Sequence, residues 1–255
     1  MLKIENCEVT GWEAAIRGMR NPKNSWGKSD SDYCEILGEL TKENSWCRCA
    51  GCKNEFVSRP NCVVIGDNDH DLMMRLRNAG TDHRKFMRMV IVYADIIAPL
   101  YWWKEYDTYK VGTVANSCST MHKIADKEFA IEDFSCEYLI RSKKTEWVNK
   151  EEMYRDENFE ELWTSYDILD QTIRVLNFYR HKYLETKYKK YWWQMIQLLP
   201  SSYNQKRTVM LNYEVLANMY KSRKNHKLDE WHVLCDWIES LPYSELITGE
   251  KRTEE

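Results

Sequence analysis

The spacing of apolar residues predicts two helices and one buried strand in the first hundred residues. Residues 8–20 carry apolar side chains at roughly helical intervals, namely Trp12, Ala15, Ile16 and Met19. This spacing predicts an early helix. Asp67–Ala79 predicts a second helix, because acidic residues stand at its start and Gly80 follows its end. Met87–Ile97 is rich in β-branched and aromatic residues and is the best strand in the sequence.

The second half of the chain predicts further helices with short breaks between them. Residues 159–198 have a helical pattern that we expect to be interrupted, and residues 208–223 and 228–239 have two shorter ones. Leu199-Pro200-Ser201-Ser202 separates the first two of these helices, and Leu241-Pro242 ends the last one. The chain therefore predicts a helix-rich α+β fold.

Residues 98–122 change abruptly from aromatic to small polar side chains. Ala98-Pro99 breaks the strand, and proline suits the first turn of the helix that follows. The first half of this stretch contains five aromatic side chains, at Tyr101, Trp102, Trp103, Tyr106 and Tyr109. The second half contains Asn116-Ser117-Cys118-Ser119-Thr120. A rigid aromatic element followed by short hydrogen-bonding groups predicts a site for a flat, polar ligand.

Composition limits the class of protein. A length of 255 residues favours one domain, in which residues 44–66 look like a cysteine-rich insertion and residues 126–165 a charged variable segment. The net charge of −3 gives no global field that favours nucleic acid, so we find no strong sign of nucleic-acid binding. No stretch has the length and apolarity of a signal peptide or a membrane span. The nine cysteines then predict reduced thiols and a cytoplasmic location.

Four of the cysteines stand close together and form a weak candidate metal site. They are Cys47, Cys49, Cys52 and Cys62. Four thiolates suit tetrahedral Zn²⁺. The usual pattern has two Cys-x-x-Cys pairs, however, and only one such pair exists here. We therefore expect no metal at the principal site.

The predicted helix 208–223 presents polar residues that could meet a ligand. On one continuous helix, Asn212 and Arg223 would share a face, and Asn218 would point about 120° away from it. Arginine offers a planar fork of donors, and asparagine offers both a donor and an acceptor. The pattern alone favours the alternative, in which the same residues form the solvated face of an ordinary helix.

Two stretches of the sequence resemble the flavin-dependent thymidylate synthases. That family has a strand, Ala-Pro and a helix, followed by a signature of Arg-His-Arg, a spacer, Ser, Asn-Glu, Ser and Arg-Tyr. Here the same order runs from Ala98-Pro99 through Thr108-Tyr109-Lys110 to Asn116-Ser117 and Ser119. In the second stretch, Leu199-Pro200, Asn212, Asn218 and Arg223 keep the family's spacing, and His226 and Trp231 echo its His-Ala-Gln-Trp-Glu ending.

The signature departs from the family at several positions. Thr108 and Tyr109 replace an arginine and a histidine, and Ser117 replaces a glutamate. Met121 stands at the place of a later arginine, and one extra residue lies inside the signature. Ile196 stands near Leu199-Pro200, where the family has an arginine that helps to bind the nucleotide phosphate.

The resemblance implies a fold and a reaction. The fold would be a central, mainly antiparallel sheet flanked by helices, in a homotetramer whose active sites combine several subunits. The reaction would be reductive methylation of dUMP to dTMP, with methylenetetrahydrofolate as the carbon donor and NADPH as the reductant acting through FAD. No protein nucleophile is implied, so Cys118 within the signature need not be catalytic.

The resemblance also implies roles for individual residues. His83, Lys110, Asn116, Asn212 and Asn218 would bind the cofactor, and Ser117, Ser119 and Arg223 would bind the nucleotide. For Asn116 and Ser119, the alternative is a pair that caps a helix. Two other functions stay open for the whole chain. It could modify a different pyrimidine, free or in nucleic acid, or it could be a nucleotide-binding scaffold that has lost catalysis.

Overall fold

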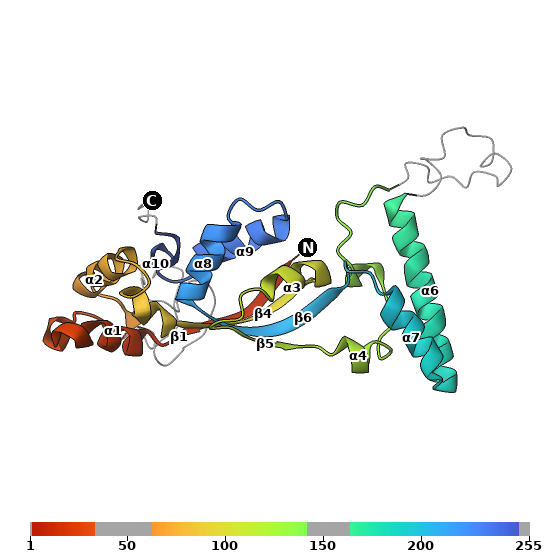
Figure 1. The fold of residues 1–255 in the computed structure, drawn as a ribbon, viewed down its shortest axis with the longest axis horizontal. Coiled ribbons are helices and arrows are strands. Elements are labelled where there is room, and N and C mark those ends of the chain that lie inside the picture. The colour runs from red at the N-terminus through yellow and green to blue at the C-terminus, as the bar shows by residue number, and fades with distance from the viewer. Residues whose placement is uncertain (1, 34–62, 142–163, 250–255) are drawn as a thin grey trace, which may run out of the picture. The chain divides into compact units, whose positions relative to one another are not determined.

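The structure, a computed structural model, describes residues 2–33, 63–141 and 164–249, and these fall into two compact units (Figure 1). We name them after their main helices. The α8 unit comprises residues 2–96, 107–116 and 208 onward, and the hairpin unit comprises residues 97–106 and 117–207. The expectation of a single domain stays a prediction.

A four-stranded antiparallel sheet confirms the predicted α+β class. Its strands are β1 (Lys3–Thr10), β4 (Ile91–Pro99), β5 (Val114–Ser117) and β6 (Asn204–Asn212), in the order β1-β4-β6-β5. The amide of Tyr213 donates to the carbonyl of Val90, and the amide of Leu100 donates to that of Tyr203. These two bonds set the antiparallel register of β4 and β6. Each of these strands contributes residues to both units.

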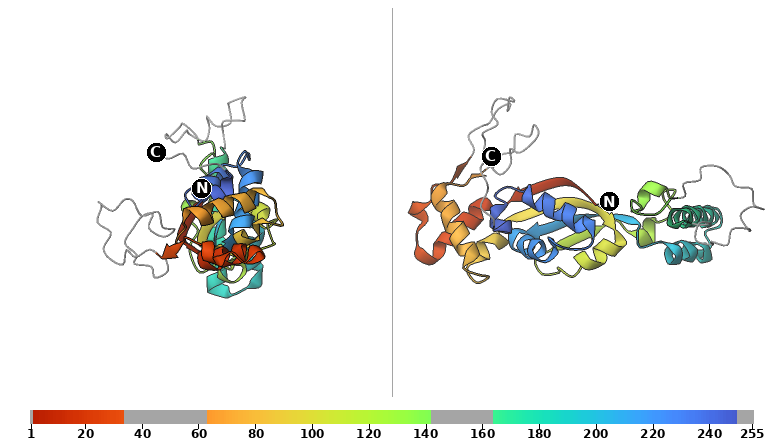
Figure 2. Two further views of the ribbon diagram at one scale, coloured as in Figure 1. Left: turned by 90° about the vertical axis from the view of Figure 1, so that its left-hand side faces the viewer. Right: turned by 90° about the horizontal axis from the view of Figure 1, so that it is seen from above.

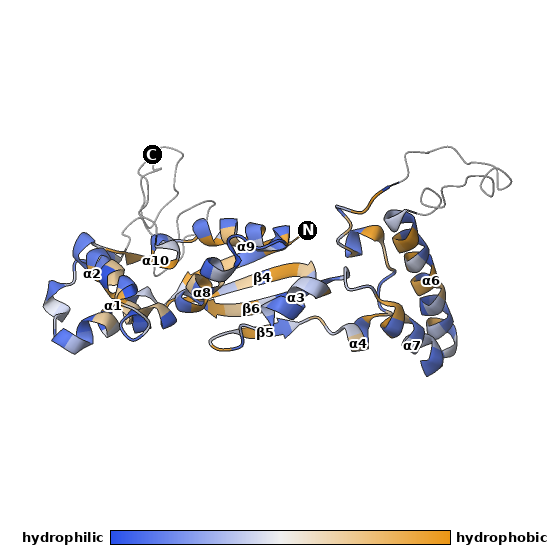
Figure 3. Ribbon diagram, turned by 45° about the horizontal axis from the view of Figure 1, so that its top comes forward, coloured by the Kyte–Doolittle hydropathy of each residue, from blue (hydrophilic) through white to orange (hydrophobic). Residues whose placement is uncertain are grey.

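The central strand β4 alternates buried apolar residues with more exposed ones. In β4, the side chains of Val92, Ala94 and Ile96 are buried, whereas Tyr93 between them is 41% exposed. A strand covered on one face only shows this alternation, because successive side chains point to opposite faces of the sheet. Figure 3 shows the apolar residues of β4 in orange. In Figures 1 and 2, α8 (Tyr213–Arg223) and α9 (Asp229–Glu239) lie over one face of the sheet.

The structure corrects the predicted bounds of this strand and of the helix that follows it. The strand begins at Ile91 rather than Met87, because residues 84–88 form the 3-10 helix η3 (Arg84–Arg88). Pro99 is the last residue of the strand and not the first of a helix, and α3 (Leu100–Tyr106) follows it. A proline fits at a strand end, where its missing N–H costs no ladder bond.

Three further strand segments of the four-stranded sheet were not predicted. Residues 3–10 form β1, so the early helix begins at Trp12, as α1 (Trp12–Arg20). Residues 208–212 belong to β6, so the predicted helix 208–223 begins only at Tyr213. Residues 114–117, predicted as part of a polar loop, form β5, and all four of its side chains are exposed. Short apolar runs such as Val209–Leu211 fit a strand as well as a helix.

The α8 unit encloses its core with several further elements. These are η1 (Asn21–Lys23), η2 (Trp26–Lys28), β2 (Asp32–Tyr33), β3 (Val63–Val64), α2 (Asp67–Asn78) and α10 (Glu245–Thr248). Helix α8 is buried almost all round, as expected for a helix that is covered on every side. A buried ion pair links α1 to α2, because the Arg20 guanidinium donates to the Asp69 carboxylate at 2.6 Å.

The hairpin unit is built from two antiparallel helices, which confirms the predicted interruption. Helix α6 (Ser165–Thr186) ends at Lys187, which has a left-handed φ of 57°, and α7 (Lys189–Leu198) runs back beside it (Figure 1). Leu176 and Met195 are fully buried between these helices and the chain around Phe134. The short α4 (Thr120–Lys123) and η4 (Ile131–Asp133) complete the unit.

Two expectations fall partly or wholly outside the described residues. Cys47, Cys49, Cys52 and Cys62 lie outside the described residues. So do residues 142–163, which make up most of the charged segment 126–165. Among the residues that are described, no group of His, Cys, Asp and Glu side chains could hold a metal ion. None of the described helices combines the length and the apolarity needed to cross a membrane.

Candidate functional site

The start of α8 is fixed by Asn212, which lies just before the helix and not on it. Its backbone is extended, with φ −128° and ψ 163°. The Oδ1 atom accepts a hydrogen bond from the amide of Val215 at 3.0 Å, which is the geometry of an N-cap. The Nδ2 atom donates to the carbonyl of Gly112 at 3.3 Å. Asn212, predicted as a cofactor contact, therefore uses both polar atoms to hold α8 and the loop 107–113.

Gly112 makes the close approach of this loop possible. Its φ of +79° lies in the left-handed region that other residues rarely adopt. A Cβ atom at this position would lie 2.7 Å from Nδ2 of Asn212 and 3.1 Å from the Val215 side chain. The glycine thus lets the signature segment pack directly against the start of α8.

The end of α8 holds Arg223 between two aromatic rings. Its Nε atom donates to the Tyr109 hydroxyl at 2.9 Å, and its guanidinium carbon lies 4.6 Å from the centre of the Trp231 ring. The Tyr109 ring is 5.6 Å from the same carbon and 6.1 Å from the Trp231 ring, edge to face. We call Tyr109, Arg223 and Trp231 the arginine bracket. Trp231 is fully buried whereas Arg223 is half-buried, so the bracket fixes a cation near the surface.

Asn218 lies on the exposed side of α8 and meets the segment that contains His83. The Asn218 Oδ1 atom accepts a hydrogen bond from Nη2 of Arg84 at 3.1 Å, and Nε of Arg84 donates to the Glu214 carboxylate at 3.1 Å. Arg88 donates to the other Glu214 oxygen. His83 precedes η3 as its N-cap residue, and its side chain is exposed. Asn218 therefore bonds to Arg84, the residue that follows His83 in the chain.

Electrostatics holds Glu214 in its charged form. Burial alone would raise the pKa of this carboxyl group, but hydrogen bonds from Arg88 and Arg84 outweigh burial and lower the pKa below its usual value. The carboxylate is 9% exposed. It therefore acts as a nearly buried anchor that ties η3 to α8.

The other predicted residues lie on exposed segments. Lys110 is exposed in the loop after Tyr109, and Asn116 is exposed on β5. Ser117, the last residue of β5, and Ser119 belong to the hairpin unit. The Ser119 hydroxyl accepts a hydrogen bond from the amide of His122 at 3.2 Å and caps α4. For Ser119, the capping alternative is thus what the structure contains.

The structure also explains the apolar residue at position 196. Ile196 is half-buried and packs against the core cluster of the hairpin unit, together with Trp192 and Leu199. An arginine at this place would have to displace that packing. The apolar environment around residue 196 therefore suits an isoleucine at the position where the family has an arginine.

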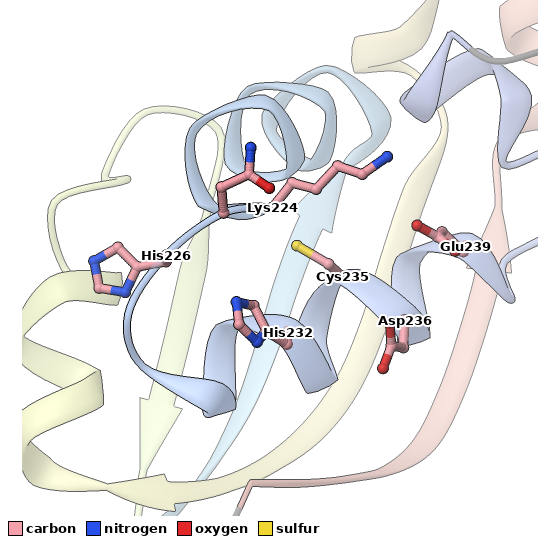
Figure 4. A pocket seen from close by; sticks show the side chains of 7 residues that line it. Lys224, His226, His232, Cys235, Asp236 and Glu239 are labelled. Carbon is pink, nitrogen blue, oxygen red and sulfur yellow. The ribbon is translucent and has the colours of Figure 1, made fainter.

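A shallow pocket of about 400 Å³ lies beside the bracket, between the end of α8 and α9 (Figure 4). Its lining is polar and carries both signs of charge, from Lys224, Asn225, His226, His232, Cys235, Asp236 and Glu239. Burial, and then the carboxylates of Asp236 and Glu239, raise the pKa of the Cys235 thiol to about 11. At neutral pH this thiol is protonated and is a poor nucleophile.

Sequence reasoning missed the residues that position the predicted ones. The sequence marks Tyr109 as one of five aromatic residues and as a replacement for a histidine, and it does not single out Arg84. Glu214 carried no signal of its own. An arginine at the end of a helix, with a tyrosine in the signature and a tryptophan eight residues later, could have suggested the bracket, because arginine often stacks on aromatic rings.

Comparison with known proteins identifies the fold. No family model matches the chain, and no curated protein matches its sequence. Solved structures do match. Thymidylate Synthase X (ThyX) from Helicobacter pylori, in a structure with FAD and dUMP, is similar over 98% of both chains, with a TM-score of 0.56 and 16% identity. The UMP/dUMP methylase PolB from Streptomyces cacaoi, bound with 5-Br UMP, is similar over 98% of this chain and 95% of that one, with a TM-score of 0.55 and 10% identity.

These likenesses extend over the whole chain, and they confirm the fold that the resemblance implied. The protein has the fold of the flavin-dependent thymidylate synthases.

Proposed function

We propose that the protein is a flavin-dependent methyltransferase that converts dUMP to dTMP with methylenetetrahydrofolate and NADPH. The observation that carries this proposal is the arginine bracket. Arg223 keeps the spacing of the family's nucleotide-binding arginine, and the side chain that holds it is Tyr109, from the signature segment. Two stretches that resemble one family, a hundred residues apart in sequence, thus meet in one contact of the α8 unit.

Arg223 is suited to bind an anionic, planar nucleotide. A guanidinium presents a fork of N–H donors that matches a phosphate or the carbonyl edge of a pyrimidine. Stacking on Trp231 and the bond to Tyr109 fix this fork before a ligand arrives, which lowers the entropy cost of binding. We propose Arg223 as a substrate contact and Tyr109 as the residue that positions it.

We propose that exposed polar residues of the α8 unit bind a flavin dinucleotide. FAD carries a pyrophosphate and a ring with several hydrogen-bonding atoms, and His83, Lys110 and Asn116 offer exposed polar side chains to such a ligand. Asn218 presents its amide beside Arg84. When bound, FAD would take up the hydride of NADPH and supply reducing power for the methylation. The chain's own residues would bind and orient it.

The choice of uracil nucleotide is the second part of the proposal. We infer dUMP as the first candidate and UMP as the alternative, because the fold is shared with a protein described as a UMP/dUMP methylase. The apolar packing of Ile196 favours a phosphate site that differs from the family's. Ser117 is also proposed to contact the nucleotide, whereas Ser119 caps α4.

A turnover assay tests the reaction and its substrate together. Purified protein with added FAD, NADPH and methylenetetrahydrofolate is expected to oxidise NADPH faster when dUMP is added and to form dTMP. The same assay with UMP and dCMP measures the preference for sugar and base. Faster turnover of UMP than of dUMP would make UMP the assigned substrate. The proposal would be overturned if none of the three nucleotides gave a methylated pyrimidine.

The homotetramer that the resemblance implies is also part of the proposal. β5 lies at one edge of the sheet, and every side chain on it is exposed within the chain. An exposed strand edge is a ready template for pairing with another chain. Sedimentation of the protein is expected to give a mass near four times 30.7 kDa. A monomer at all concentrations would contradict this part.

A further inference from the structure

The turn between α6 and α7 gathers lysine and aromatic side chains on one exposed surface. Its members are Lys187, Tyr188, Lys189, Lys190 and Trp193, and we call them the lysine–aromatic turn. All five side chains are exposed, with Tyr188 at 61% and Trp193 at 41%. Neither the arginine bracket nor the proposed methylation uses this surface. Figure 1 shows where the end of α6 meets the start of α7.

The local charge differs from that of the whole chain. Residues 181–198 contain four lysines and one glutamate, whereas the full sequence has a net charge of −3. The lysines also lie against aromatic rings. Nζ of Lys190 is 4.8 Å from the Tyr191 ring centre, and Nζ of Lys189 is 5.8 Å from that of Trp193. The turn therefore combines a strong positive charge with planar surfaces.

The beginning of α7 violates the usual preferences of a helix N-terminus. The macrodipole favours acidic residues in the first turn, yet α7 has none and begins with Lys189 and Lys190. The N-cap residue is Tyr188, and no side chain caps the helix. Residues that oppose local stability in this way often serve a ligand instead. An anion at this point would relieve the unfavourable charge and meet the positive end of the dipole.

The packing of the hairpin does not require these side chains. The contact between α6 and α7 is made by buried residues such as Leu176 and Met195, whereas the five residues of the turn point to solvent. Exposed contacts between a lysine and an aromatic ring contribute little to stability. Folding alone therefore leaves the composition of the turn unexplained.

The arrangement of the side chains distinguishes between two kinds of polyanion. A membrane surface is bound by helices that separate an apolar face from a basic one. Here the order Lys187-Tyr188-Lys189-Lys190 interleaves rings with cations. A single-stranded nucleic acid presents the matching order, because bases that can stack on rings alternate with phosphates that attract lysines.

We propose that the lysine–aromatic turn binds single-stranded nucleic acid, with Lys187, Lys189 and Lys190 on phosphates and Tyr188 stacked on a base. This goes beyond the proposed methylation. It also departs from the expectation that net charge sets for the whole chain, because the positive charge is local. The contacts involve the backbone and the faces of the bases, so binding is independent of base sequence.

The test is fluorescence anisotropy of a labelled 20-nucleotide oligo(dT) titrated with the full chain. We expect a dissociation constant on the order of 10 µM at 50 mM NaCl, rising steeply with salt. The variant with Lys187, Lys189 and Lys190 all changed to Glu is expected to bind at least tenfold more weakly. Its plot of log affinity against log salt should be flatter by about two units, because three phosphate contacts are lost.

Two further variants separate charge from stacking. Tyr188→Ala keeps every lysine and is expected to weaken binding about tenfold through the loss of one stacked base. The matched control changes the exposed lysines Lys3, Lys23 and Lys28 of the α8 unit to Glu, which alters the net charge by the same amount. The control is expected to bind within about twofold of the unchanged protein. Circular dichroism melts check that each variant is folded.

Three results would overturn the proposal. The first is absence of oligonucleotide binding at 50 mM NaCl by the folded, unchanged protein. The second is an equal loss of binding in the control and in the triple variant of the turn. The third is binding to vesicles that contain phosphatidylserine, lost in the turn variant, without binding to oligo(dT); the surface would then bind membranes.

Discussion

The two ends of α8 use similar polar residues for different purposes. At its start, the Asn212 side chain is 6% exposed and both of its polar atoms bond to the protein. At its end, the half-buried Arg223 is held by Tyr109 and Trp231. Matching spacing along a sequence therefore does not mean a matching role. The start of α8 stabilises the fold, and we propose that its end meets the ligand.

The largest effect is expected at the end of α8. Arg223→Ala should weaken dUMP binding about 10- to 100-fold, because hydrogen bonds to a charged group contribute about 1.5–3 kcal/mol. It should cost stability only about 0.5–1 kcal/mol, from the lost stacking on Trp231. Isothermal titration and urea unfolding measure the two quantities. Lys221→Ala removes an exposed cation two residues earlier and serves as the matched control.

The anchor between η3 and α8 should give a stability effect that depends on pH. Glu214→Gln leaves two arginines without their carboxylate and should cost about 2 kcal/mol at pH 7. The folded pKa of Glu214 is lowered, so its stabilising effect is complete above the ordinary value of 4.5 and is lost as pH falls below it. Urea unfolding of both proteins from pH 7 to pH 3 measures this. A difference that grows in acid would contradict the assignment.

The start of α8 should respond in stability and not in ligand binding. Asn212→Ala removes the N-cap and should lower the free energy of unfolding by about 1–2 kcal/mol. Asn212→Asp keeps the capping acceptor but sets a carboxylate oxygen against the Gly112 carbonyl, so it should recover only part of that loss. Equal dUMP affinities, measured where all three proteins are folded, would support the division of roles. A large loss of affinity in Asn212→Asp would place Asn212 in the ligand site.

The smallest effect is expected for Tyr109. Tyr109→Phe keeps the ring beside Arg223 but removes one hydrogen bond, so dUMP affinity should fall about three- to tenfold. The effect should lie in KM rather than in kcat, because Tyr109 positions Arg223 and does not act on the reacting atoms. Tyr109→His restores the residue type of the family and is the informative companion. An unchanged KM in Tyr109→Phe would show that Tyr109 does not position Arg223 for nucleotide binding.

The sequence predicted the elements with a long apolar pattern and missed those defined by tertiary contacts. Helices α2 and α9 follow from spacing and from terminal residues, whereas a break within residues 159–198 was expected without a position. Asn212 was misplaced because Val209–Leu211 fits either period, so only the sheet shows where the strand ends. β1 was missed because its side chains are mostly polar or exposed.

The candidate site was predictable at the level of spacing but not of contacts. Arg223 was found because its distance from Leu199-Pro200 and Asn218 matches the family. Its partner Tyr109 lies 114 residues away, and no local pattern indicates that the two side chains meet. Likewise, the charged run around His83 gave no sign that Arg84 reaches Glu214 and Asn218. Such pairs depend on the packing of the whole α8 unit.

The central claim is that Arg223 binds a uracil nucleotide in a protein that also binds a flavin. The most direct measurement is the absorption spectrum of purified protein loaded with FAD, recorded during titration with dUMP. We predict a bound flavin spectrum that dUMP perturbs saturably, and that Arg223→Ala shifts the midpoint to at least tenfold higher dUMP. Protein that takes up no FAD, or a flavin spectrum that dUMP leaves unchanged, would contradict the account.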